Sequence, residues 1–232
     1  MRAVVLDRFG GSDAVRVAEV PPPVTGQGEI LVDMRAASVN PADWKLREGW
    51  LRDAFTPAFP YVTGFDGAGV IVGTGRRVAV KTAVGRGGAG AMAALAAVPA
   101  RLAVPIPDAI SFAEAAALPT AGIAAWEAVI EQGRVAAGQR VFVNGGSGGT
   151  GSIAIQLARM LGAEVAASAS AANLDYLEAL GARPIDYRAA VADGRIRPPA
   201  VEILPLDRAP EAIERVRQGH VRGKLVLEIA PG

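Results

Sequence analysis

A glycine-rich stretch in the middle of the chain has the residue types of a phosphate-binding turn. Residues 144–152 read NGGSGGTGS and contain the spacing Gly146-x-Gly148-x-x-Gly151. Glycines at such positions permit a tight turn, let phosphate oxygens approach backbone N–H groups, and let a helix pack closely on a strand. A bound phosphate would then lie at the positive end of the helix that follows.

The residues on either side of the turn argue against a flexible linker. The apolar run 141–143 precedes it, and Ile153, Leu157 and Leu161 follow it at helical spacing on one face. A buried strand that leads through glycines into an amphipathic helix is the βα turn of a dinucleotide-binding unit. A tight turn without a ligand remains the alternative interpretation.

The end of the next predicted strand indicates which dinucleotide would bind. An NAD site places Asp or Glu roughly 20 residues after the glycines, to hold the ribose hydroxyls. This chain has Ser168, Ala169 and Ser170 there, and small side chains leave room for a 2′-phosphate. We therefore predict NADPH as the cofactor. Tyr187 and Arg188, after the following strand, could reach the same pocket, although Arg188 could equally be an ordinary surface arginine.

The elements that must position this turn alternate between strands and helices. Residues 140–188 read as strand, helix, strand, helix, strand, which predicts a parallel sheet with helical crossovers. The first third of the chain contains short β-branched runs instead, and strands return in the tail. We predict an α/β protein with a β-rich domain at 1–118 and 200–232, and a partial dinucleotide-binding unit at 119–199.

Composition excludes several other classes of function. The chain has 232 residues, no cysteine and one histidine, which removes disulfides, thiolate catalysis and Cys/His zinc sites. The net charge is +1, so the chain lacks the excess of positive charge that is typical of proteins that bind nucleic acid or a membrane surface. The N-terminus lacks the apolar core of a signal peptide, and proline and charged residues interrupt the apolar stretches. We expect a cytoplasmic protein with no bound metal.

Several stretches taken together carry a family resemblance: MRAVVLDRFGG, RAASVNPADWKLREG, GFDGAGVIVG, AEAAALPTAGIAAWEAV, NGGSGGTGSIAIQLA, IDYR and GHVRGKLVLEI. They resemble the zinc-free quinone oxidoreductase, or zeta-crystallin-like, branch of the medium-chain dehydrogenase/reductase superfamily. The resemblance covers 1–188 and 194–229. It implies a GroES-like β-rich domain formed by both chain ends, a Rossmann domain inserted between them, and NADPH-dependent reduction of a quinone or other α,β-unsaturated carbonyl.

The resemblance also implies roles for residues of the inserted domain. The positions that match the pyrophosphate loop are Gly148, Gly149, Thr150 and Gly151. Ser168 and Tyr187 match positions near the 2′-phosphate.

Three further residues match positions on the nicotinamide and substrate side. Asn40, in the SVNP motif, corresponds to a residue beside the nicotinamide, and a helix N-cap before Pro41 is a compatible alternative. Lys45 could hydrogen-bond a substrate carbonyl as charge develops on it, or could be a solvated helix lysine. Thr120 is expected to line the cofactor cleft, although a core or capping threonine is the alternative.

The chain departs from the resemblance after Tyr187. A full dinucleotide fold has two halves with six strands, and only three strands are predicted by this point. The dozen residues 188–199 are too few for a further βαβ unit, which needs about 30. Two classes therefore remain: a working NADPH-dependent reductase, and a remnant that only binds nucleotide or has a structural role. Uncovered strand edges and apolar faces predict a homodimer or larger assembly.

Overall fold

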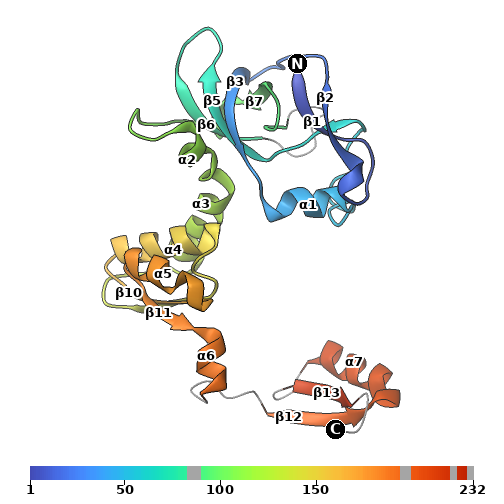
Figure 1. The fold of residues 1–232 in the computed structure, drawn as a ribbon, viewed down its shortest axis with the longest axis vertical. Coiled ribbons are helices and arrows are strands. Elements are labelled where there is room, and N and C mark those ends of the chain that lie inside the picture. The colour runs from blue at the N-terminus through green and yellow to red at the C-terminus, as the bar shows by residue number, and fades with distance from the viewer. Residues whose placement is uncertain (83–89, 194–199, 220–223, 229–232) are drawn as a thin grey trace.

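The computed structural model describes residues 1–82, 90–193, 200–219 and 224–228. Within these residues the chain forms three parts, which Figure 1 shows in chain order from blue to red. They are a β-rich domain, an α/β unit, and a C-terminal unit of two strands and one helix. No helix in these ranges is both long and apolar enough to cross a membrane.

The β-rich domain contains two antiparallel sheets with the strand orders β2-β1-β4 and β7-β3-β5-β6-β8. Alternating apolar residues turn one face of the larger sheet inward, where Val32, Val80 and Val98 are fully buried. The strands are β1 (Arg2–Leu6), β2 (Val15–Glu19), β3 (Glu29–Ser38), β4 (Tyr61–Val62), β5 (Asp66–Ile71), β6 (Arg77–Lys81), β7 (Leu95–Pro99) and β8 (Ala103–Pro105). The helices are α1 (Pro41–Arg47) and α2 (Phe112–Ala116), with short 3-10 turns at Ser12–Ala14 and Ala100–Leu102.

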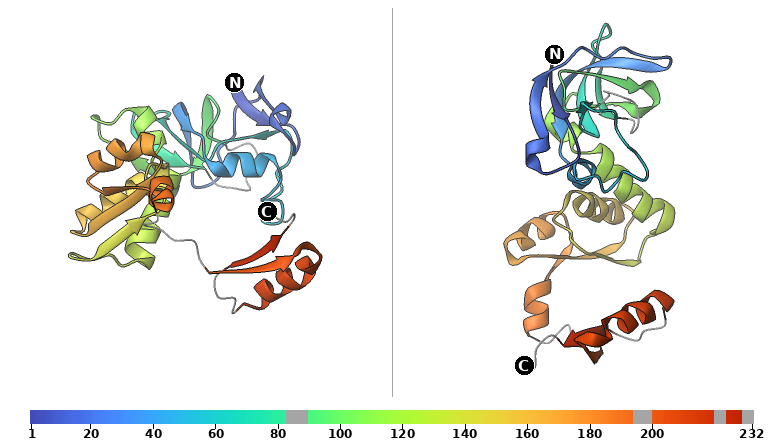
Figure 2. Two further views of the ribbon diagram at one scale, coloured as in Figure 1. Left: turned by 60° about the horizontal axis from the view of Figure 1, so that its bottom comes forward. Right: turned by 90° about the vertical axis from the view of Figure 1, so that its right-hand side faces the viewer.

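The α/β unit contains a parallel sheet in the order β11-β10-β9, and its helices α4 and α5 pack on these strands. Helix α3 joins the unit to the β-rich domain and packs against α4 (Figure 2). The elements are α3 (Pro119–Trp126), its π-helical continuation (Glu127–Gln132), β9 (Arg140–Val143), α4 (Gly149–Met160), β10 (Glu164–Ala169), a 3-10 turn (Ala171–Asn173), α5 (Leu174–Ala179), β11 (Arg183–Asp186) and α6 (Tyr187–Ala192).

This parallel sheet confirms the predicted α/β fold class. Its three strands also match the number expected from the sequence up to Tyr187. In the described part of the chain, β9 has β10 on one side and no strand on the other. The sheet is therefore one half of the six-stranded dinucleotide fold.

The C-terminal unit contains β12 (Val201–Pro205) and β13 (Lys224–Glu228), which pair in parallel and, among the described strands, only with each other. The assignment of 200–232 to the β-rich domain stays a prediction. Helix α7 (Ala209–Gln218) connects them after a 3-10 turn at Leu206–Arg208. A helical crossover is what a parallel pair requires, and the sequence pattern of the tail contains one. The boundary between 118 and 119 stays a prediction.

Candidate functional site

The glycine turn connects β9 to α4 and has little room for side chains. Gly145 has a φ of +70°, a conformation that glycine adopts without strain. A Cβ on Gly146 would lie 2.8 Å from the Cβ of Ala167, and a Cβ on Gly151 would overlap the carbonyl oxygen of Gly145. These two glycines therefore allow the strand, the turn and the helix to pack closely, as the sequence predicts.

The first turn of α4 presents unpaired backbone donors at an open surface. Gly148, Gly149 and Thr150 are exposed, and the carbonyl of Gly148 accepts the first helical hydrogen bond from the Ser152 N–H at 2.9 Å. No acceptor among the described residues meets the N–H groups of residues 149–151. Donors at the positive end of a helix, two of the three on glycines, suit the pyrophosphate of a dinucleotide.

Ser168 supports this turn from inside the molecule. Its Oγ donates to Oδ1 of Asn144 at 2.7 Å and accepts from the N–H of Gly145 at 3.2 Å, while its carbonyl accepts from Gly146 at 2.9 Å. The residue is only 3% exposed. The side chain thus points toward the loop backbone, and the place of Ser168 near a 2′-phosphate stays a prediction.

Tyr187 and Arg188 lie at the same edge of the sheet, after β11. The parallel register pairs Ala169 with Asp186, so the ends of β10 and β11 are level. Both predicted side chains are exposed, and the Arg188 guanidinium carbon is 5.7 Å from the centroid of the Tyr187 ring. Oδ1 of Asp186 accepts from the N–H of Arg188 at 2.9 Å. The pair is thus accessible to a ligand on the turn, with no interaction joining it to Ser168 in the described residues.

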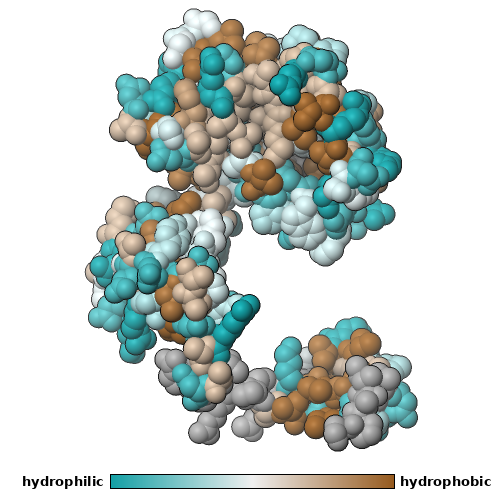
Figure 3. Space-filling model, in the orientation of Figure 1, coloured by the Kyte–Doolittle hydropathy of each residue, from teal (hydrophilic) through white to brown (hydrophobic). Residues whose placement is uncertain are grey.

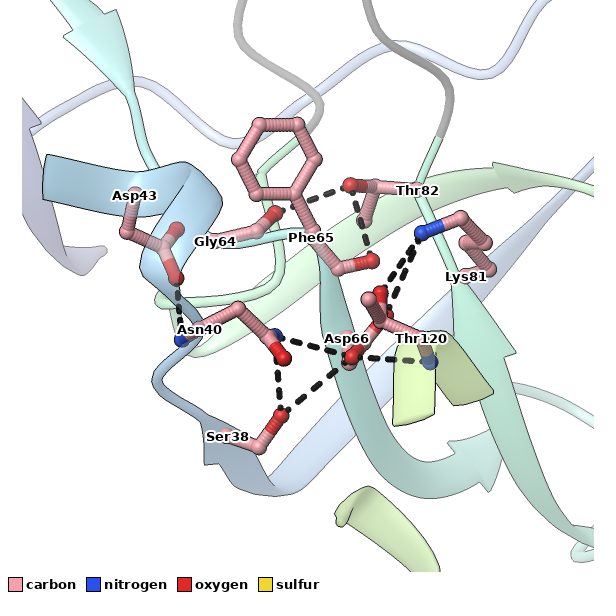
Figure 4. Close-up of polar contacts among 9 residues, drawn as sticks. All are labelled: Ser38, Asn40, Asp43, Gly64, Phe65, Asp66, Lys81, Thr82 and Thr120. Carbon is pink, nitrogen blue, oxygen red and sulfur yellow. Dashed lines mark hydrogen bonds and ion pairs between the residues drawn. The ribbon is translucent and has the colours of Figure 1, made fainter. Parts of the chain in front are cut away.

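A buried carboxylate, Asp66, forms the second cluster of polar residues (Figure 4). It begins β5 and is 0% exposed. Its Oδ2 accepts from Nδ2 of Asn40 at 2.9 Å and from Oγ of Ser38 at 3.4 Å. Nδ2 of Asn40 also donates to Oγ of Ser38 at 3.3 Å. We call these residues, together with Thr120 and Lys81, the Asp66 network.

Thr120 and Lys81 complete the Asp66 network from the other side. Oγ1 of Thr120 donates to Oδ1 of Asp66 at 2.7 Å, and its N–H donates to Oδ2 at 3.1 Å. Nζ of Lys81 donates to Oγ1 of Thr120 at 2.8 Å and lies 3.5 Å from Oδ1 of Asp66. Because Thr120 is in the first turn of α3, the Asp66 network joins the β-rich domain to the α/β unit.

Asn40 both caps α1 and belongs to the Asp66 network, so its two predicted roles are compatible. Its backbone N–H donates to Oδ2 of Asp43 at 2.6 Å. Burial raises the pKa of Asp43 above its ordinary value of 3.8. Lys45 lies one turn further along, half-buried, with Nζ 5.7 Å from the centroid of the Trp44 ring. No interaction in the described residues connects Lys45 to Asp66.

The two polar clusters meet across the first turns of α3 and α4. A Cβ on Gly149 would lie 3.6 Å from the Cβ of Ala121, the residue that follows Thr120. The open end of α4 therefore lies beside the Asp66 network, and an elongated ligand could contact both. Among the described residues, no group of three acidic or histidine side chains is arranged to hold a metal ion.

Comparison with known proteins agrees with this architecture. Residues 26–108 match the family described as "Alcohol dehydrogenase GroES-like domain", and residues 121–227 match "Zinc-binding dehydrogenase". A crystal structure of the quinone oxidoreductase from Thermus thermophilus, also solved in complex with NADPH, is 31% identical and superimposes with a TM-score of 0.69 over 98% of this chain and 73% of that chain. The chain belongs to the quinone oxidoreductase branch of the medium-chain dehydrogenase/reductase superfamily. The resemblance inferred from the sequence motifs is confirmed.

Two relatives with curated names extend the comparison. A chloroplastic quinone oxidoreductase of Triphysaria versicolor is 34% identical over 202 residues, which cover 81% of this chain. An NADPH-dependent alkenal/one oxidoreductase of Arabidopsis thaliana is 34% identical over 204 residues and again covers 81% of this chain. The matched region spans 61% and 52% of these relatives, respectively, so this chain corresponds to little more than half of their length.

The sequence prediction missed the centre of the site. Asn40 and Thr120 were expected near a cofactor, and the structure brings them onto the same carboxylate. Asp66, Ser38 and Lys81 were not singled out. The available signal was a lone acidic residue in the otherwise apolar and glycine-rich run GFDGAGVIV, where a charge needs a buried partner.

Proposed function

We propose that this chain is an oxidoreductase that transfers a hydride from NADPH to a quinone or another α,β-unsaturated carbonyl. One observation carries the proposal: unpaired N–H groups at the start of α4 lie next to a half-buried Asn40 and Thr120 that share one carboxylate. A dinucleotide needs both features, because its pyrophosphate requires donors and its nicotinamide requires a polar cleft. The names of the relatives support the same activity.

Each predicted site residue has a role in this proposal. The loop Gly148, Gly149, Thr150 and Gly151 would hold the pyrophosphate. Thr120 and Asn40 would lie on the nicotinamide side, and the bound cofactor would supply the hydride. Lys45 would donate a hydrogen bond to the substrate carbonyl as negative charge develops on its oxygen.

The preference for NADPH over NADH rests on the edge formed by β10 and β11. Residues 170–174, directly after β10, contain no carboxylate, and Arg188 at the end of β11 has an exposed guanidinium. A guanidinium can bind a 2′-phosphate bidentately, whereas NADH has no group there to receive it. Ser168 contributes indirectly in this scheme, because it supports the loop.

A cofactor titration tests the proposal. NADPH and NADH are titrated separately while cofactor fluorescence is followed, and a small quinone is then added while consumption of the reduced cofactor is recorded. We expect tighter binding of NADPH and turnover with the quinone. Arg188→Ala should weaken NADPH binding alone, whereas the control Arg183→Ala, at the opposite end of β11, should change neither affinity. Equal binding of both cofactors by the unmodified protein would refute the NADPH preference.

Nucleotide binding without turnover is the second candidate function. It is favoured by the three-stranded sheet, because hydride transfer requires reacting atoms near 3–3.5 Å and the second half of the fold helps to position them. Binding of NADPH with no consumption in the presence of several quinones and enones would select it.

Insensitivity of any turnover to a metal chelator would support zinc independence. A cytoplasmic location also stays a prediction, since both curated relatives are chloroplastic.

A further inference from the structure

The Asp66 network has a fixed direction of hydrogen bonding. A carboxylate paired with a lysine only accepts, so every group that faces Asp66 must donate to it. Nδ2 of Asn40 has two hydrogens, and they go to Asp66 and Ser38. The single hydroxyl hydrogen of Thr120 goes to Asp66 at 2.7 Å. The donors of Asn40 and Thr120 are therefore used inside the protein.

What remains on these two side chains is acceptor capacity. Within the described ranges, Oδ1 of Asn40 faces only the backbone N–H of Asp43, in the capping box of α1, and so keeps at least one lone pair. Oγ1 of Thr120 accepts once, from Lys81 at 2.8 Å, and has a second lone pair. Both side chains are only half-buried, so each retains surface for a ligand. A ligand that contacts them would have to bring its own hydrogen-bond donors.

We infer that Asp66 is a positioning residue that makes this part of the cleft selective for a ligand with an N–H donor, the class to which the carboxamide of a nicotinamide belongs. The inference rests on the proposed function and adds that Asn40 and Thr120 act as hydrogen-bond acceptors toward the ligand. These residues would recognise the cofactor amide. They would not stabilise negative charge on a substrate carbonyl, because an oxyanion needs donors and theirs are used.

A cofactor analogue tests this inference by binding alone. In the acetylpyridine analogue of NADP, an acetyl group replaces the carboxamide, which removes the N–H donors and keeps the carbonyl. Affinities for the oxidised cofactor and for the analogue are measured by calorimetry on the full chain. We expect the analogue to bind about tenfold more weakly, the loss for one or two hydrogen bonds that leave a polar partner unsatisfied.

Substitution of Asp66 then tests its positioning role. In Asp66→Asn, residue 66 can donate as well as accept, so the Asn40 amide is free to turn. The ratio of the two affinities should fall from about ten toward one, whereas a purely structural role would weaken both ligands equally and leave the ratio unchanged. The matched control is Asp13→Asn, an exposed aspartate paired with Arg8, which should keep the ratio of the unmodified protein.

Asn40→Ala provides a second route if circular dichroism shows that Asp66→Asn does not fold. It removes the acceptor itself, and the affinity ratio should again approach one. Equal affinities for the two ligands in the unmodified protein would overturn the inference, as would an unchanged ratio in Asn40→Ala or in a folded Asp66→Asn. Absence of binding by either ligand would instead refute the proposed function.

Discussion

The α/β unit and the C-terminal unit are built from the same parts but bury them very differently. Both have parallel strands connected by a helix. In the α/β unit, Ile155 and Leu177 are 0% exposed. In the C-terminal unit, Ile203 is 64% and Ile213 is 69% exposed, and brown apolar atoms cover much of the face seen in Figure 3. A parallel sheet needs covering on both faces, and two strands with one helix cannot provide it.

The comparison shows what the third strand and the extra helix of the α/β unit contribute. Helices α4 and α5 pack on its strands and α3 packs against α4, so a continuous core forms. The hydrophobic residues buried in the described part of the C-terminal unit are only Leu204 and Ala212. With so few buried residues that unit is not expected to be stable by itself, because a two-stranded sheet alone is marginally stable in water.

The largest expected effect on stability is that of a substitution in the core of the α/β unit. Ile155→Ala should lower the free energy of unfolding by about 2–5 kcal/mol, because a fully buried aliphatic side chain leaves a cavity. The matched variant Ile203→Ala should change it by less than about 0.5 kcal/mol, because that side chain is exposed. Urea unfolding followed by circular dichroism measures both values.

If Ile203→Ala lowered the free energy of unfolding as much as Ile155→Ala, the two units would not differ in burial. That result would show that the face of β12 is covered. The sequence-based assignment of 200–232 to the β-rich domain predicts that outcome. An apolar cavity of about 800 Å³ lined by Val104, Leu118 and Trp126 offers a receiving surface beside α3. Val104→Ala should then show a loss similar to that of Ile203→Ala.

The next effect concerns the turn that distinguishes the α/β unit. Gly151→Ala should destabilise the protein by about 1–3 kcal/mol and abolish NADPH binding, because its Cβ would overlap the carbonyl of Gly145. Gly122→Ala is the control, since a Cβ there would meet no atom within 4 Å and Gly122 lies outside the turn. Thermal melts and cofactor titration measure the two properties. Retained binding in Gly151→Ala would contradict the proposed role of the turn.

Assembly gives a third way to sharpen the comparison. Among the described strands β9 pairs only with β10, and its Phe142 is 59% exposed; an unpaired strand edge with exposed apolar side chains favours association with another chain. We expect a homodimer in light scattering across a dilution series, and a monomer for Phe142→Lys. A compact monomer at every concentration, with no binding of a hydrophobic dye, would refute the dimer.

The smallest effect is a pH dependence in the β-rich domain. Burial raises the pKa of Asp43, so its ionised form costs folding free energy above that raised pKa, and the cost vanishes below the ordinary value of 3.8. Asp43→Asn should therefore be slightly more stable than the unmodified protein at neutral pH, with the difference lost in acid. Asp13→Asn should behave oppositely, because Arg8 lowers the pKa of Asp13. Melting temperatures measured between about pH 3 and pH 8, a range that includes the titration of carboxyl groups, test both predictions.

Local patterns predicted the fold of the first two parts and of the turn. The alternation of strands and helices, the 3.6-residue periodicity after the turn and the glycine spacing all act over short stretches of sequence, and the structure has them. The partners of β12 and β13 could not be predicted in the same way. Strand pairing over long sequence separations depends on which surfaces are available, and periodicity does not contain that information.

The candidate site was predictable only in part for the same reason. The loop Gly148–Gly151 is contiguous, so its spacing was visible in the sequence. The Asp66 network brings together residues from 38 to 120, and no local spacing relates them. The sequence places Ser168 after the second strand of the unit, but it does not determine the direction of the hydroxyl, which is turned to Asn144.

The bond between Asp66 and Thr120 has a consequence for how the molecule unfolds. It ties the first turn of α3 to β5, so the β-rich domain cannot open at this point without removing both Thr120 donors from a buried carboxylate. The two parts should share one cooperative transition rather than melt one after the other. A ligand bound at the turn before α4 should then slow the hydrogen exchange of backbone amides in β5, although the ligand does not contact them.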